Sequence, residues 1–142
     1  MSFDLKILKG DIATSSGGLQ TVTGTDKVRQ DILKILLTEL GSNKFHPAYG
    51  SKLGAIQIGY IADPELVDSD LRSSAEEAIL KLMNLQGSQS KVQFVSPEER
   101  ILAINYIDVT RDKLDPRMYN IGISVTTQRL KTIEDTVAVR VI

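Results

Sequence analysis

The sequence contains no cysteine and no tryptophan, and its one histidine is His46. Without cysteine the chain has neither a disulfide framework nor a thiolate metal site, a composition that suits a protein made in a reducing cytoplasm. His46 has no second histidine one helical turn away and no clustered acidic ligands beside it. We therefore expect no metal and no cofactor, and we interpret His46 as a surface or turn residue.

The sequence also has no marked excess of positive or negative charge and no long run of apolar residues. The 17 Lys and Arg face 18 Asp and Glu, for a net charge of −1, and no basic run stands out. A nucleic-acid groove needs a concentrated basic face, and a transmembrane helix needs roughly 18 or more consecutive apolar residues. The stretch MSFDLKILKG lacks the apolar segment of a signal peptide. No nucleic-acid or membrane partner is expected, and the default is a protein made and used, or assembled, inside a cell.

Motifs of common enzyme classes are missing as well. The glycines show no phosphate-binding or dinucleotide-binding pattern, and no GxSxG elbow supports a Ser-His-Asp triad. A glycosidase needs only two suitably spaced carboxylates, but a chain with 18 acids offers many such pairs. The candidates are better explained as helix-terminal charges or solvated faces, so we expect no enzyme and no small-molecule substrate. These candidates are Glu39, Asp63, Glu65, Glu76, Glu98 and Glu99.

The composition that remains is that of a globular protein, with 42% apolar and 25% charged residues. A chain of 142 residues is long enough to bury about two-thirds of its unfolded surface. No internal repeat or low-complexity tract divides it. We predict one domain over residues 1–142, with residues 129–142 as a C-terminal strand or arm.

Apolar periodicity predicts two main helices in the first half. Helical spacing runs over residues 26–40, after an N-cap at Thr25 or Asp26 and before Gly41, which is well placed to end the helix. A second helical segment begins at Asp63-Pro64-Glu65 and continues to Gly87, as one helix or as two shorter ones.

Alternating apolar residues predict strands, mainly in the second half. The strand-like segments are residues 3–8, 91–95, 101–109, 119–127 and 136–142. The fold class expected from these elements is α+β, with two main helices in the first half packed on an antiparallel sheet formed mainly by the second half.

The segment SPEER at residues 96–100 joins two of the predicted strands. Two interpretations stay open for it. Two acids followed by an arginine can form a local charged turn. Alternatively, Arg100 can present its planar fork of donors to a carboxylate or to backbone carbonyls of a partner.

Taken together, these landmarks resemble a known family over most of residues 25–126. The order is a helix, a Pro-x-aromatic-Gly-Ser-x-Leu loop, a second helix and a strand–Glu-x-Arg–strand turn. The chain is similar in this to the small baseplate wedge subunit of contractile phage tails, a family that includes tail-lysozyme-like wedge proteins, baseplate assembly protein W and a component of type VI secretion and related contractile injection systems. The matching residues are Gln30, Ile32, Leu36, Leu37, Gly41, Pro47, Tyr49, Gly50, Ser51, Leu53, Arg72, Ala78, Glu98, Glu99 and Arg100.

Two departures accompany the resemblance. Family members often carry Gly-Glu-Arg ahead of the loop proline, where this chain has Gly41-Ser42-Asn43. The family turn is usually Glu-Pro-Arg, whereas this chain has Glu98-Glu99-Arg100 with its proline displaced to Pro97.

The resemblance implies that the glycine-rich loop at residues 41–54 is structural. Pro47 would stiffen the chain, and Tyr49 would reach the core beneath the first helix. Gly50 would permit backbone angles that a side chain forbids, and Ser51 would cap the following turn.

The resemblance also implies a structural subunit that binds other wedge proteins and templates the tail sheath protein by strand pairing. Its place would be the virion tail baseplate, assembled in the host bacterial cytoplasm. Glu98, Glu99 and Arg100 would meet wedge partners, and the last strand would recruit sheath more than it serves folding, through Val137, Val139 and Val141. The alternatives are a peptidoglycan-cleaving muramidase of the tail and an interaction module of an unrelated cellular complex.

Overall fold

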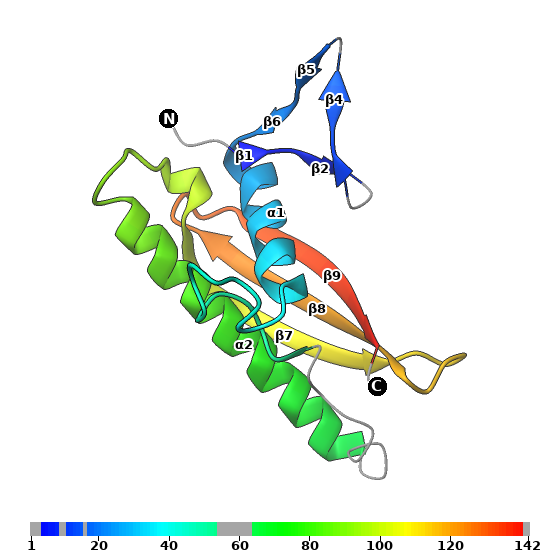
Figure 1. The fold of residues 1–142 in the computed structure, drawn as a ribbon. Coiled ribbons are helices and arrows are strands. Elements are labelled where there is room, and N and C mark those ends of the chain that lie inside the picture. Colours follow the sequence, from blue (N-terminus) through cyan, green and yellow to red (C-terminus); the bar gives the residue numbers. More distant parts are fainter. Residues whose placement is uncertain (1–3, 9–10, 16, 54–63, 141–142) are drawn as a thin grey trace.

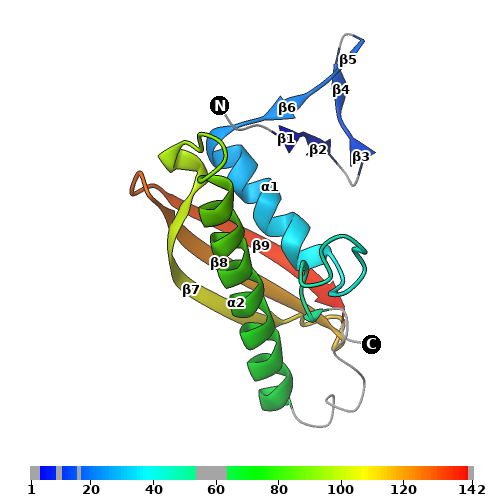
Figure 2. The same ribbon diagram turned by 60° about the vertical axis from the view of Figure 1, so that its left-hand side comes forward.

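The computed structural model describes residues 4–8, 11–15, 17–53 and 64–140. Two helices lie side by side over one face of a three-stranded antiparallel sheet, and short N-terminal hairpins sit beside the first helix (Figures 1 and 2). The predicted α+β class is confirmed. The elements are β1 (Asp4–Leu5), β2 (Ile7–Leu8), β3 (Asp11–Ile12), β4 (Thr14–Ser15), β5 (Gly18–Leu19), β6 (Thr21–Val22), α1 (Gly24–Leu37), α2 (Pro64–Gln89), the 3-10 helix η3 (Pro97–Glu99), β7 (Ile101–Arg111), β8 (Met118–Thr127) and β9 (Thr132–Arg140).

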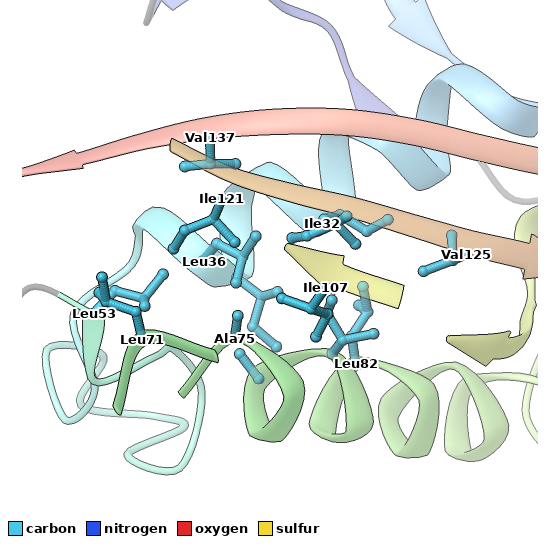
Figure 3. Close-up of a cluster of buried hydrophobic side chains, with 14 of the residues drawn as sticks. Ile32, Leu36, Leu53, Leu71, Ala75, Leu82, Ile107, Ile121, Val125 and Val137 are labelled. Carbon is cyan, nitrogen blue, oxygen red and sulfur yellow. The ribbon is translucent and has the colours of Figure 1, made fainter. Parts of the chain in front are cut away.

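The core lies between the two helices and the sheet. The strand order is β7-β8-β9, and the register places Ile121 opposite both Val109 and Val137. Figure 3 shows side chains from both helices and all three strands pointing toward one another. The labelled members of this cluster are Ile32, Leu36, Leu53, Leu71, Ala75, Leu82, Ile107, Ile121, Val125 and Val137.

Helix α1 ends at Leu37, three residues earlier than its apolar spacing predicts. The reason is a pairing with the following loop, in which Ser51 N donates to Thr38 O (2.9 Å) and Leu40 N donates to Ser51 O (3.1 Å). These extended bonds hold residues 38–40 out of the helix. Gly41 is left-handed, with φ of 86°, but it lies beyond the end of α1.

The predicted N-terminal strand is broken at Lys6, because three two-stranded antiparallel sheets, β1-β6, β2-β3 and β4-β5, meet there. Lys6 N donates to Gln20 O (2.9 Å), Gln20 N donates to Ala13 O (3.0 Å) and Ala13 N donates to Lys6 O (2.8 Å). Gln30 of α1 fastens this junction, since its Oε1 accepts from Ile7 N (2.8 Å) and its Nε2 donates to Leu5 O (2.7 Å). A buried glutamine therefore joins the hairpins to the core layer.

An ion pair adds to the same attachment. Lys34 Nζ lies 2.7 Å from Asp4 Oδ2. Burial alone would raise the pKa of Asp4, but the hydrogen bond and charge of Lys34, together with hydrogen bonds from Leu5 N and Gln30, outweigh it, so the pKa lies below its ordinary value.

The prediction of a strand at residues 91–95 is wrong. The amides of Lys91 and Val92 donate to Ser88 O (3.2 Å) and Gln89 O (3.1 Å), so the segment continues the turn at the end of α2. Within the described residues, the segment 91–95 pairs with no strand, and Val92 and Phe94 are exposed. Alternation alone does not supply a neighbouring strand.

The expectation that the C-terminal segment serves recruitment more than folding also needs correction. β9 pairs with β8 from Thr132 to Arg140, and Ile133, Val137 and Val139 are buried in the core. The segment is an integral strand and not an arm. Val141 lies outside the described residues.

Candidate assembly surfaces

The loop after α1 is tied to the helix end through its stem. Gly50 has φ of 120°, and a Cβ at this position would lie 2.7 Å from Thr38 O. Ser51 is buried, and its Oγ donates to Leu36 O (2.6 Å) and accepts from Leu53 N (3.4 Å). The stem therefore requires glycine followed by a small hydroxyl side chain.

The tip of the same loop faces solvent and α2. Asn43 Oδ1 accepts from Phe45 N (3.0 Å), which holds a turn where Phe45, His46 and Pro47 are exposed. Tyr49 is half-buried against the core, and this burial raises its pKa. The tip lines one side of a groove of about 740 Å³ whose other side is α2.

Substituting Gly50 by alanine is expected to destabilise the protein by about 1–3 kcal/mol, because the backbone is left-handed and the new Cβ meets Thr38 O. The measurement is urea unfolding followed by circular dichroism. The matched control is Gly41→Ala, which shares the positive φ but has nothing within 4 Å of its Cβ. Equal losses in the two variants would show that the close approach at Gly50 carries no cost of its own.

The two glutamates of SPEER lie at the N-terminus of α1. Thr23, the N-cap of α1, makes no side-chain capping bond, and Gly24 N instead donates to Glu99 Oε1 at 3.2 Å. A carboxylate at this position satisfies a free amide and complements the positive end of the helix dipole. Glu99 is 2% exposed, and Glu98 lies 3.9 Å from Arg129. Both acids thus have contacts inside the chain, and their role in partner binding stays a prediction.

Arg100 differs from these two glutamates. Its side chain is half-buried, and Nη2 lies 3.9 Å from the position of a Cβ at Gly87, in the last part of α2. Arg100 therefore stands near the negative end of the α2 dipole. Helix α2 has no basic residue of its own in its last turn. Across the part of the chain that the structure describes, no hydrogen bond or ion pair holds the guanidinium. Its five donors are available to a partner.

Among the described residues, β9 is an edge strand of the sheet, paired on one side with β8 and open on the other. In an antiparallel pair of strands, residue pairs that exchange main-chain hydrogen bonds alternate with pairs that do not. Thr127 N donates to Lys131 O (2.9 Å), so the hydrogen-bonded pairs of β8 and β9 can be counted from Thr127 and Lys131. By that alternation Val137 and Val139 bond to β8, whereas the main chain of Thr136 and Ala138 faces outward. Side chains of Val137 and Val139 are already buried, so a partner at this edge would meet main-chain groups.

An apolar groove lies beside this edge. Its volume is about 660 Å³, and its lining includes Ile7 from the hairpins, Leu33 and Leu37 from α1 and Asp135 from β9. Leu37 is 65% exposed and Ile7 41% exposed. An added strand could place alternate side chains in this groove.

The acids considered for catalysis are distributed over distant elements. Glu39 follows the C-terminal end of α1, while Glu98 and Glu99 lie at its N-terminal end. A 14-residue helix rises about 21 Å, far beyond the roughly 5–9.5 Å that separates glycosidase carboxylates. Glu76 is exposed on α2, Glu65 lies in the first turn of α2, and Asp63 lies outside the described residues.

Neither a metal cluster nor a membrane-crossing helix is found in the described part of the chain. No group of three or more His, Cys, Asp or Glu there could hold a metal ion. No helix there is long and apolar enough to cross a membrane.

Comparison with known proteins gives a match at the level of structure. No protein-family model and no curated protein matches the chain. Its fold matches the crystal structure of a Geobacter sulfurreducens protein described as a tail lysozyme, with a TM-score of 0.62. The two are 11% identical, and the match covers 82% of this chain and 90% of that chain. The chain thus shares the fold of that protein, which supports the predicted resemblance at the level of fold.

Sequence reasoning missed the structural role of Gln30. Gln30 is among the residues that match the family, but its place between the apolar positions of α1 indicated no structural role for it. Its burial and its bonds to the N-terminal hairpins depend on residues more than 20 positions away. No local signal in the sequence could have revealed them.

Proposed function

We propose that the chain is a structural subunit of a contractile-tail baseplate wedge, which binds other wedge proteins and templates the sheath by strand pairing. The observation that carries this proposal is the open edge of β9 beside an apolar groove, on a fold shared with a protein described as a tail lysozyme. Its place would be the baseplate of the tail, without cofactor, nucleic acid, membrane or small-molecule substrate.

Strand addition suits this edge for a physical reason. The helices cover the apolar face of the sheet, so the edge can accept a strand without opening the core. Main-chain hydrogen bonds would supply affinity, and the groove lined by Ile7 and Leu37 would select side chains of the added strand. The tail sheath protein is the proposed source of that strand.

Arg100 is the proposed contact with other wedge proteins. It is half-buried, and among the described residues its guanidinium has no partner. A carboxylate or carbonyl of a neighbour would satisfy those donors with charge-assisted bonds.

A muramidase is the second candidate, and the description of the structural neighbour as a tail lysozyme favours it. Against it, Glu39 and the glutamates of η3 lie at opposite ends of α1, and Glu99 caps that helix from a buried position. We propose that the chain is not an enzyme.

Co-expression of the tagged chain with the other baseplate proteins of its tail is expected to yield a stable wedge complex on affinity purification. Arg100→Ala should keep the melting temperature within about 2 °C and weaken the complex tenfold or more, since an interfacial charged hydrogen bond is worth about 2–5 kcal/mol. Thermal melts and pull-downs measure the two effects. A large loss of melting temperature would mean instead that Arg100 braces the chain itself.

The same purified chain separates the two candidate functions. It should release nothing from peptidoglycan, and Glu39→Gln and Glu98→Gln should change nothing. Reproducible turnover that vanishes with one of these substitutions would reject the structural role.

A further inference from the structure

The turn between β8 and β9 contains a leucine where the backbone favours glycine. Leu130 N donates to Thr127 O (2.8 Å) and Thr127 N donates to Lys131 O (2.9 Å), the pattern of a bulge whose first residue is left-handed. Leu130 has φ of 62°, and no other non-glycine residue of the described chain has a positive φ. Glycine would adopt this conformation without steric cost.

Packing inside the chain does not explain the leucine. Leu130 is 76% exposed, so its side chain gains little from burial while its backbone is strained. The isolated protein would be more stable with glycine at this position. A contact outside the chain would supply the benefit that the leucine does not gain inside it.

The surroundings of Leu130 are cationic. Arg129 and Lys131 flank it, and both are exposed. Gln128 N donates to Arg100 O (3.0 Å), which ties the turn to η3. Figures 1 and 2 show the orange turn next to η3 at the same end of the molecule. Of the acids here, Glu98 lies 3.9 Å from Arg129 and Glu99 is buried.

We propose that Leu130 is an apolar knob that inserts into a socket on another wedge protein, one whose rim carries carboxylates. The inference rests on the proposed function and adds the contact surface and the chemistry of its partner. The apolar side chain fits an apolar socket, and the exposed cations Arg129 and Lys131 beside it favour acidic residues at the rim of that socket. The short hydrogen-bonded turn holds the knob in place before binding, which lowers the entropic cost of association.

The decisive variant is Leu130→Gly, because folding and binding should change in opposite directions. Its melting temperature should rise by about 3–5 °C as the strain is removed. Its capture of co-expressed wedge proteins should fall tenfold or more. Leu114→Gly is the matched control, since Leu114 is 95% exposed in the turn between β7 and β8 and should leave capture unchanged.

Each other result decides against the inference in a distinct way. A lower melting temperature for Leu130→Gly would assign the leucine to the fold. Unchanged capture would overturn the knob while leaving the wedge function intact, and no capture by the unaltered chain would overturn both. Light scattering completes the test, because a self-dimer lost in Leu130→Gly would place the socket on a second copy and overturn the wedge partner.

Discussion

Deletion of residues 130–142 is expected to abolish cooperative folding. The deletion removes β9, whose Ile133, Val137 and Val139 are buried in the core. Burial of such side chains is worth about 1.5–3 kcal/mol each, so roughly 5–9 kcal/mol is lost. The whole stability of a domain is only about 5–15 kcal/mol. The loss also exposes Ile121 and Val125 of β8, which favours aggregation.

Circular dichroism and urea titration of the truncated chain test this expectation. A soluble truncated protein with a sharp unfolding transition would show that β9 is dispensable. The point substitution Val137→Pro is the finer test, because it removes a ladder bond to β8 and a buried side chain without shortening the chain. It should lower the stability of the full-length protein by about 3 kcal/mol or more.

The helices and the three long strands could be predicted from the sequence because their periodicity matches the burial. The alternation of Ile121, Ile123 and Val125 in β8 corresponds to side chains that are all buried. The same alternation in residues 91–95 predicted a strand wrongly, since none of the described strands lies beside it to accept its hydrogen bonds. A local pattern indicates which face of a segment is apolar. Whether that face is buried depends on contacts with the rest of the chain.

The candidate surfaces were harder to predict, because they depend on contacts between distant residues. Glu99 reads as a turn acid, yet it caps a helix 75 positions away. Thr38 reads as part of α1, yet its pairing with Ser51 ends the helix. Leu130 could not be identified from the sequence, because what distinguishes it is a positive φ, and the sequence does not reveal the backbone angles of a leucine.

Ala138→Pro is expected to leave the fold intact and to stop sheath growth. By the alternation along β9, the amide of Ala138 faces the open edge, and its side chain is exposed. Proline is tolerated at such edge positions because no internal bond is lost. An added strand, in contrast, would lose a main-chain donor and meet the ring. A lost hydrogen bond that leaves its partner unsatisfied costs about 1–3 kcal/mol, and the ring adds to this.

That cost corresponds to roughly tenfold to hundredfold weaker strand pairing. Electron microscopy of assembled baseplates incubated with sheath protein gives the readout, as the fraction that carries sheath. Ala138→Val is the matched control, because it enlarges the side chain but keeps the amide donor, and it should support growth. Normal growth on Ala138→Pro baseplates would exclude the edge of β9 as the template, whereas failure of both variants would point to the exposed face of the strand in place of its main chain.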